Sequence, residues 1–249
     1  SNMEYENYLN KYRNNIDLIL PAYNEERSIK KCINDFESLK IFKNIIVIDN
    51  NSSDKTYDEI KKTNAICFKE KKQGYGASII RGFKESKADY VITCEPDLTF
   101  SHKDVFKFLI YLNDFDCVFG TRTSKSMIGL GAKMSRYLRY GNIFVAKFLE
   151  YLFQGPSLTD VGCSYKAFKK DSIKEIINDL YVTSSHFQPE LMIKLIQSKN
   201  KIIEIPVFYL KRKGYSKITY NFYSSFRVAI NMIKLIIFLF IKIKIFNQK

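Results

Sequence analysis

The most informative stretch of this chain is residues 90–97, Tyr90-Val91-Ile92-Thr93-Cys94-Glu95-Pro96-Asp97. The first five residues form a short apolar run, which predicts a strand buried in a sheet. Glu95 and Asp97 follow directly. Because one residue separates them at the end of a strand, we expect both carboxylates to point out of the sheet in the same direction. Such a pair can hold a divalent cation that prefers oxygen ligands, with a diphosphate completing the coordination. A solvated turn is the alternative, because two acids one residue apart also occur by chance.

The first half of the chain alternates between strand-like and helix-like segments. Its second helix has Ser52 or Ser53 as a plausible N-cap. The alternation predicts an α/β fold with a mostly parallel sheet and helices on both faces. Ligands of such sheets bind beyond the carboxyl ends of the strands, where Asp49, Glu95 and Asp97 fall. The predicted strands are residues 16–20, 44–49, 65–69, 90–94 and 116–120, and the predicted helices are residues 24–40, 53–62, 74–86 and 101–112.

The second half has a different organisation, with helical segments, one further strand and two basic loops. A long apolar tail begins at Asn221. We therefore predict one domain over residues 3–220 and an appended helical segment over residues 221–249. The predicted elements of this half are a basic loop at 127–133, helices at 135–152 and 189–197, a strand at 201–207 and a second basic loop at 211–217.

The chain carries a net charge of +14, and the distribution of this charge is uneven. Residues 199–249 contain eleven Lys or Arg and one acid, Glu204, and residues 117–149 contain six Lys or Arg and no acid. Such a field favours an anionic partner: phosphates, nucleic acid or an acidic membrane face. The five cysteines show neither close pairing nor zinc-site spacing, which favours a reducing, cytoplasmic compartment. With only two histidines, we expect no histidine-based triad or zinc site.

Four segments follow one another at the predicted strand ends: LILPAYNEERSI, IIVIDNNSSDKT, GYGASIIRGF with YVITCEPD, and TDVGCSYKAFKK. In order and spacing they resemble glycosyltransferase family 2, whose members are inverting enzymes with a GT-A fold. The resemblance covers about residues 16–220. It implies a Rossmann-like GT-A domain that takes its sugar from a nucleoside diphosphate sugar, carried on GDP or UDP.

The resemblance also implies roles for residues that bind the donor. Glu25 would meet the ribose and Asp49 the base, with backbone N–H groups after the first strand helping to seat the nucleoside. The alternatives are a first-turn helix acid for Glu25 and a turn or cap role for Asp49. For Gly74 and Gly76, the alternative is an ordinary loop. The implied donor-binding residues are Pro21, Tyr23, Glu25, Asp49, Asn51, Gly74, Gly76, Glu95 and Asp97.

Glu95 and Asp97 fill the position of the family's metal site, which implies Mg²⁺ or Mn²⁺ as the cofactor. The family usually has Asp at the first position, so Glu95 is a departure. We expect Asp97 to be the direct ligand. The longer side chain of Glu95 would reach the ribose, or the metal through a water molecule.

By the same resemblance, the catalytic residues would be Asp97, Arg122, Asp160 and Glu190. Arg122 would hold a phosphate with two hydrogen bonds, and a surface ion pair is its alternative. Asp160 or Glu190 would act as a general base toward an acceptor hydroxyl, or would instead cap a helix or orient a loop. A phosphate acceptor, already anionic at neutral pH, needs no base.

The later segments favour such a phosphate acceptor. The basic loop at 211–217 looks like the closing region of polyprenyl-phosphate sugar synthases, of the dolichyl-phosphate mannose or glucose synthase type. There, a basic loop surrounds phosphates. Ordinary basic residues on a solvated surface are the alternative. The residues implied in binding the acceptor or its phosphate are Arg136, Arg139, Arg212, Ser216 and Lys217.

The apolar tail predicts an amphipathic helix. Fourteen residues lie between Arg227 and Lys242, and Lys234 interrupts them, so the segment is shorter than the roughly 20 residues that a membrane span needs. At helical spacing the polar residues form one stripe, which suits a helix lying on an anionic membrane surface. We therefore expect a peripheral protein at the cytoplasmic face of the membrane. Packing on the enzyme's own core, or in a homodimer, is the alternative.

Three rival functions are weaker. A nucleotidyltransferase would have a glycine-rich, Arg-Leu-containing loop where this chain has Pro21-Ala22-Tyr23-Asn24. A nucleic-acid-binding module suits the charge, but the basic segments flank the paired carboxylates, and we expect no nucleic-acid partner. A family 2 enzyme acting on a hydroxyl of a lipid-linked sugar or polysaccharide stays open. The sequence thus predicts a metal-dependent transfer of a sugar to a polyprenyl phosphate.

Overall fold

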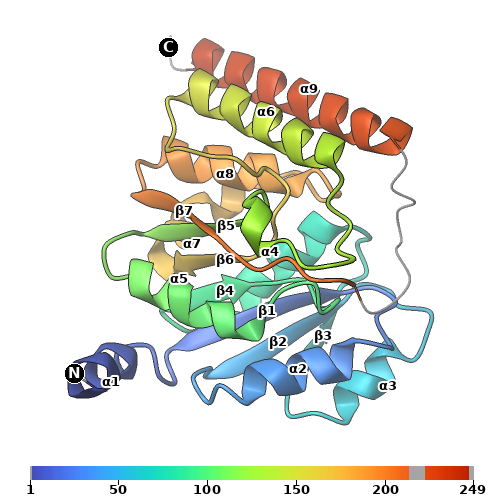
Figure 1. Ribbon diagram of the computed structural model, residues 1–249, viewed down its shortest axis with the longest axis vertical. Helices are drawn as coiled ribbons and strands as arrows, with labels where there is room; N and C mark the ends of the chain where they lie inside the picture. The colour runs from blue at the N-terminus through green and yellow to red at the C-terminus, as the bar shows by residue number, and fades with distance from the viewer. Residues whose placement is uncertain (1, 213–221, 247–249) are drawn as a thin grey trace.

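The computed structural model describes residues 2–212 and 222–246, which build a seven-stranded sheet with helices on both faces (Figure 1). The strand order is β3-β2-β1-β4-β6-β5-β7. β6 runs antiparallel to both β4 and β5, and the other neighbouring strands are parallel. The predicted mostly parallel α/β sheet is confirmed. The strands are β1 (Ile16–Ala22), β2 (Asn44–Asp49), β3 (Ile66–Lys69), β4 (Tyr90–Thr93), β5 (Cys117–Thr121), β6 (Lys166–Lys169) and β7 (Ile202–Pro206).

Side chains along each strand alternate between two apolar cores, one on each face of the sheet. In β1, Leu18 and Leu20 belong to the first core and Ile19 to the second. The second face carries an extra layer, because α6 and α9 pack together outside α8 (Figure 1). The first face is covered by α1 (Asn2–Asn10), α2 (Ile29–Glu37), α3 (Thr56–Lys61) and α5 (Val105–Tyr111), and the second by α4 (Tyr75–Glu85), α6 (Arg136–Phe153), α7 (Lys170–Ile176), α8 (Phe187–Gln197) and α9 (Phe222–Phe246).

The structure corrects several local predictions. Helix α2 begins at Ile29 rather than at residue 24, because residues 23–28 form turns in which Asn24 has a φ of 52°. The cap predicted at Ser52 or Ser53 is wrong, since α3 has Lys55 at its N-cap and no side-chain cap bond. Strand β6 and helix α7 were not predicted. β6 has only four residues, and its buried Lys166 interrupts the apolar pattern by which strands are recognised.

Helix α9 packs one face against the protein itself. Met232, Ile236 and Leu239 are buried against α6 and α8, and the ring of Phe240 meets that of Phe153 edge to face at 5.7 Å. Across the described residues, no helix is both long and apolar enough to cross a membrane. The predicted division between residues 220 and 221 lies outside the described residues.

Candidate active site

The loops that follow β1 and β2 are interlocked by side-chain hydrogen bonds, and this fixes Glu25. The backbone N–H of Glu25 donates to Thr56 Oγ1 at 2.8 Å, and that of Asn24 donates to Ser52 Oγ at 3.0 Å. Asp54 accepts from the backbone N–H of Thr56 at 3.0 Å, which explains its place in the motif. The short polar side chains after β2 therefore satisfy the backbone of the other loop, as such residues do in turns.

Asn50 organises the next loop and is not among the site residues predicted from the sequence. Its Nδ2 donates to the carbonyls of Glu70 and Lys72 at 2.9 and 2.8 Å, and its Oδ1 accepts from the N–H of Gly74 at 2.8 Å. Asn50 is buried at the end of β2, beside the predicted Asp49. One amide side chain thus fixes the loop at residues 70–74 against the strand end. Position in the motif was the only available signal.

Gly74 and Gly76 contact protein backbone in this structure. Gly74 has a φ of +134°, and a Cβ on it would lie 2.0 Å from the carbonyl oxygen of Thr183. A Cβ on Gly76 would lie 2.3 Å from the carbonyl oxygen of Val182. Both glycines are therefore required by the close approach of the segment at residues 182–184, whatever else they bind.

Glu190 shapes that same segment. It is buried on α8, and its Oε1 accepts from the backbone N–H groups of Tyr181 and Val182 at 2.8 and 2.9 Å. The sequence left a general base, a helix cap and a loop-orienting residue open for Glu190, and this geometry favours the orientation of a loop.

Glu25 and Asp97 come together around one cation, Arg212. Arg212 Nη2 donates to Glu25 Oε1 at 3.1 Å, and Arg212 Nε lies 3.6 Å from Asp97 Oδ2. Asp97 is buried, and its Oδ1 accepts from the backbone N–H and hydroxyl of Thr99 at 3.0 and 2.5 Å. The second oxygen of Asp97 is thus turned toward Arg212 at the carboxyl edge of β4. Ser216 and Lys217 lie outside the described residues.

The electrostatics of Glu95 reflect the same crowding of carboxylates. Enclosure by the protein and the nearby charge of Asp97 raise the pKa of Glu95, while Arg122 and Arg212 oppose the rise. A carboxylate that is held close to another carboxylate gains most from a bound cation.

The donor set suits Mg²⁺ or Mn²⁺. Glu95 and Asp97 offer hard oxygen ligands, and two nearby arginines can pair with phosphate oxygens. Among the described residues, no group of three or more His, Cys, Asp or Glu is arranged to hold a metal ion. The protein would therefore supply few ligands, and the donor's diphosphate and water the rest, as is usual for Mg²⁺.

Arg122 and Asp160 form a buried ion pair with two parallel bonds. Arg122 Nε and Nη2 each lie 2.9 Å from one oxygen of Asp160, and the backbone N–H of Arg122 also donates to the carboxylate at 3.0 Å. The N–H groups of Gly162 and Cys163 bring the donors to five. A Cβ on Gly162 would lie 2.9 Å from Arg122 Nη2, so this residue leaves room for the guanidinium.

This environment makes Asp160 a poor base. Burial alone would raise its pKa, but the charge and hydrogen bonds of Arg122 outweigh burial, and the net pKa is lower than usual. Arg122 is therefore not the surface ion pair considered from the sequence, since its side chain is 13% exposed and that of Asp160 fully buried. The sequence left a general base, a helix cap or a loop-orienting residue open for Asp160; the geometry instead favours a role that was not predicted, holding Arg122 in place.

A second carboxylate supports this pair from behind and was not identified from the sequence. Glu204 on β7 accepts from the backbone N–H groups of Thr159 and Asp160 at 2.8 and 3.2 Å, and from the hydroxyl of Thr159 at 2.6 Å. Burial raises the pKa of Glu204 to about 7, with bonds from Thr159 opposing the rise and the charge of Asp160 adding to it.

The two predicted arginines of α6 differ in placement. Arg139 Nε donates to the carbonyl of Thr123 at 2.5 Å, which ties the first turns of α6 to the loop after β5 that carries Arg122. Arg136 is exposed, and the described residues give it no hydrogen bond or ion pair. The helix begins as predicted, with Ser135 Oγ accepting from the N–H of Leu138 at 3.1 Å.

A buried network of polar side chains connects β6 to the start of α4, and it was not predicted from the sequence. Lys166 is fully buried and donates to Gln188 Oε1 at 2.8 Å and to the carbonyl of Cys163, and Gln188 Nε2 donates to the hydroxyl of Tyr75 at 2.7 Å. Burial, and next the charge of Glu95, raise the pKa of Tyr75, which keeps this hydroxyl neutral. The hydrogen bonds of this network fix the hydroxyl of Tyr75 near Glu95.

A comparison with known protein families shows to which family the chain belongs. Residues 17–177 match the family described as Glycosyl transferase family 2. The chain belongs to this family. Family 2 glycosyltransferases are enzymes, so the predicted family and enzyme class are confirmed.

Two relatives of this glycosyltransferase are named for transfer to dolichyl phosphate. The chain is 27% identical to the dolichyl-phosphate hexose transferase of Haloferax volcanii, over 81% of this chain and 85% of that protein. It is 28% identical to the UDP-N-acetylglucosamine–dolichyl-phosphate N-acetylglucosaminyltransferase of Methanococcus voltae, over 77% of this chain and 84% of that one.

The fold of this family 2 enzyme is also that of a solved structure. It is similar to glucosyl-3-phosphoglycerate synthase from Mycobacterium tuberculosis, solved with Mn²⁺, UDP and glucosyl-3-phosphoglycerate. The TM-score is 0.71 over 94% of this chain and 81% of that one, at 14% identity. At this identity the likeness shows the fold, and the predicted GT-A fold is confirmed.

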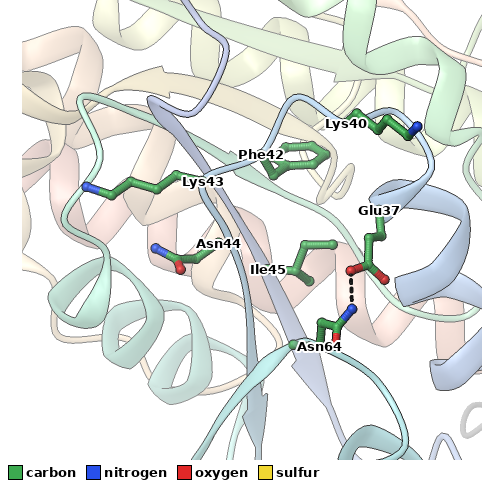
Figure 2. A pocket seen from close by; sticks show the side chains of 8 residues that line it. Glu37, Lys40, Phe42, Lys43, Asn44, Ile45 and Asn64 are labelled. Carbon is green, nitrogen blue, oxygen red and sulfur yellow. Dashed lines mark hydrogen bonds between the residues drawn. The ribbon is translucent and has the colours of Figure 1, made fainter.

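A cavity at the opposite edge of the sheet is not part of the site of this glycosyltransferase. It has a volume of about 170 Å³ and lies where β2 begins, with Glu37, Lys43 and Asn44 in its lining (Figure 2). Glu37 Oε1 accepts from Asn64 Nδ2 at 2.8 Å across it. The candidate site around Glu95, Asp97 and Arg212 lies instead at the carboxyl ends of the strands, where ligands bind in such sheets.

Proposed function

We propose that this enzyme transfers a sugar, with inversion, from a nucleoside diphosphate sugar to a polyprenyl phosphate. The observation that carries the proposal is the carboxylate pair Glu95 and Asp97 at the end of β4, with Arg122 and Arg212 beside it. Carboxylates for a divalent cation and arginines for phosphate oxygens are the two requirements of a nucleoside diphosphate site. The relatives named for transfer to dolichyl phosphate support the acceptor.

In the proposed reaction, a phosphate oxygen of the acceptor attacks C1 of the sugar, and the bond from C1 to the diphosphate breaks. A bound Mg²⁺ or Mn²⁺, held by Asp97 and Glu95, would neutralise the diphosphate. Arg122, whose Nε and Nη2 are held by Asp160, would offer its remaining N–H groups to a phosphate. The acceptor phosphate is ionised at neutral pH, so neither Asp160 nor Glu190 is required as a base.

Several assignments from the sequence belong to this proposal. Glu25 and Asp49 would bind the nucleoside of GDP or UDP, and the basic residues of α6 and of the loop at 211–217 would bind the acceptor phosphate. Because that phosphate lies at a bilayer surface, the enzyme would work at the cytoplasmic face of the membrane as a peripheral protein. Residues 221–249 would contribute to its attachment.

The test is a transfer assay with UDP- and GDP-sugars and Mn²⁺ or Mg²⁺, with and without a short, water-soluble polyprenyl phosphate. Asp97→Asn keeps an acceptor for Thr99 and removes the charge, and Asp171→Asn on α7, whose side chain is 89% exposed, is the matched control. We expect turnover that needs both acceptor and metal, lost in Asp97→Asn and unchanged in Asp171→Asn. Transfer only to a sugar hydroxyl would overturn the acceptor assignment. No binding of either nucleotide would overturn the donor site.

A further inference from the structure

Helix α6 carries an aromatic stripe on its solvent side. The spacing of three, four and seven residues between its members places them on one face, opposite the buried Val145, Ala146 and Leu149. Soluble proteins usually place polar residues on such a face. The stripe consists of Tyr137 (74% exposed), Tyr140 (57%), Phe144 (64%) and Tyr151 (82%).

Helix α9 extends this apolar surface. It lies beside α6 in the outermost layer of the molecule (Figure 1). Its inner face is buried, and its outer face carries exposed apolar side chains between cations. The exposed large apolar side chains there are Phe226, Ile237, Phe238, Ile241 and Ile245. Exposed apolar side chains on the face turned away from the core indicate that this face contacts a partner or a membrane.

The charges on the two helices are almost all positive. Glu150 is the only acid in either helix, and it is neutralised, since Lys147 Nζ lies 3.2 Å from its Oε1 and the N–H of Leu158 donates to the same oxygen. The cations on these helices are Arg136, Arg139, Lys147, Arg227, Lys234, Lys242 and Lys244. Tyrosines at the surface, aliphatic side chains and cations without free acids are the combination found at the interface of an anionic bilayer.

We propose that the outer faces of α6 and α9 together form the surface by which the enzyme docks on an anionic lipid bilayer. A second copy of the chain fits this surface less well, because two such faces would bring like charges together. The proposal rests on the proposed function and specifies which surface of the enzyme faces the bilayer. The bond from Arg139 to Thr123 ties α6 to the loop of Arg122, so lipids under α6 would lie next to the phosphate-binding arginines.

The docking surface is tested by flotation with vesicles of phosphatidylcholine alone or with an equal part of phosphatidylglycerol. The double variant Phe144→Ser with Tyr151→Ser removes two members of the stripe. Its matched control is Ile110→Ser with Tyr111→Ser, on helix α5 at the other face of the sheet, where both side chains are also exposed. We expect binding that needs the anionic lipid, lowered about tenfold by the α6 pair and unchanged by the α5 pair.

A depth measurement uses the absence of Trp from the chain. Tyr151→Trp provides a single fluorophore on α6, and Tyr111→Trp provides the control on α5. With anionic vesicles, emission from Trp at position 151 should shift to the blue and be quenched by lipids brominated on the acyl chain, and emission from position 111 should not change.

Equal losses for the two pairs, or a blue shift at position 111, would overturn the proposal. So would burial of the fluorophore at position 151 in a dimer seen by sedimentation without lipid. Neither measurement uses a sugar donor, so failure of docking is distinguishable from failure of the proposed reaction in the assay with a water-soluble acceptor.

Discussion

Replacing Asp160 with Asn removes one charge from the buried ion pair and keeps the shape of the side chain. The oxygen of Asn can accept hydrogen bonds as one carboxylate oxygen does. Its NH₂ group would then face other donors, either those of Arg122 or the N–H groups of Gly162 and Cys163. Asp160 is fully buried and Arg122 is 13% exposed, so the guanidinium would keep its charge in a poorly solvated place without its partner.

Removal of one partner of a buried pair costs about 3–5 kcal/mol of unfolding free energy. For a chain of this length, each kcal/mol lowers Tm by about 2–4 °C, so we expect a fall of about 6–20 °C. The control is Asp116→Asn, which breaks the pair of Asp116 with Lys169. Those side chains are 30% and 36% exposed, and loss of their ion pair should cost at most about 1 kcal/mol. Denaturant unfolding of the two variants measures the difference.

Transfer assays over a range of pH then separate the two roles of Asp160. If Asp160 holds Arg122, Asp160→Asn lowers kcat and weakens nucleotide binding at every pH, and the shape of the pH profile is unchanged. If Asp160 is a base, the wild-type rate falls at low pH and this limb disappears in the variant. A variant as stable as the wild type, or one that loses the acid limb, would refute the reasoning.

Three further predictions concern other residues of the site. Gly74→Ala should unfold the seat of the segment at residues 182–184, because its Cβ would lie 2.0 Å from the carbonyl oxygen of Thr183, and amide hydrogen exchange there should rise; unchanged exchange would contradict this. Glu204 has a folded pKa of about 7 against its ordinary 4.5, so its ionised form is disfavoured on folding and wild-type stability should fall as the pH rises from about 4.5 to about 7. Glu204→Gln should remove that fall of about 2 kcal/mol in denaturant titrations, a value reduced for partial exposure, and equal slopes in both proteins would refute the assignment. Arg212→Gln should tighten Mn²⁺ binding alone and weaken binding of UDP or GDP, each by about tenfold in calorimetry, because Asp97 loses a competing cation and the diphosphate loses a partner; a change of both in one direction would argue against it.

The sequence predicted the sheet well where the chain follows simple periodic patterns. All five strands predicted in the first half occur within one or two residues of their expected bounds, because each is a short apolar run between polar loops. Strand β6 escaped because Lys166 lies within it, and this lysine is buried only because Gln188 and the carbonyl of Cys163 accept its protons. A local sequence pattern does not predict that Gln188, twenty-two residues away, is the partner of Lys166.

The candidate site was predictable in its membership more than in its pairings. The motifs located Glu25, Asp97 and Arg122 after strand ends and Asp160 in the segment TDVGCSYKAFKK, which is a property of their position in the chain. That Arg122 binds Asp160, and that Arg212 joins Glu25 to Asp97, depends on the packing of distant segments. Asn50 was missed because its function is to bind backbone carbonyls, which a sequence does not display.

These pairings bear on the chemistry of the acceptor. A hydroxyl acceptor needs a base with an accessible lone pair and a pKa near the working pH. Asp160 accepts five hydrogen bonds and has a lowered pKa, and Glu190 uses Oε1 to hold the backbone of residues 181 and 182. Asp160 is therefore not prepared to remove a proton, and Glu190 has one oxygen committed to backbone N–H groups, whereas an acceptor phosphate arrives already ionised. Asp160 holds Arg122 in place and Glu190 holds the segment beside Gly74, and a phosphate acceptor needs no base from either of them.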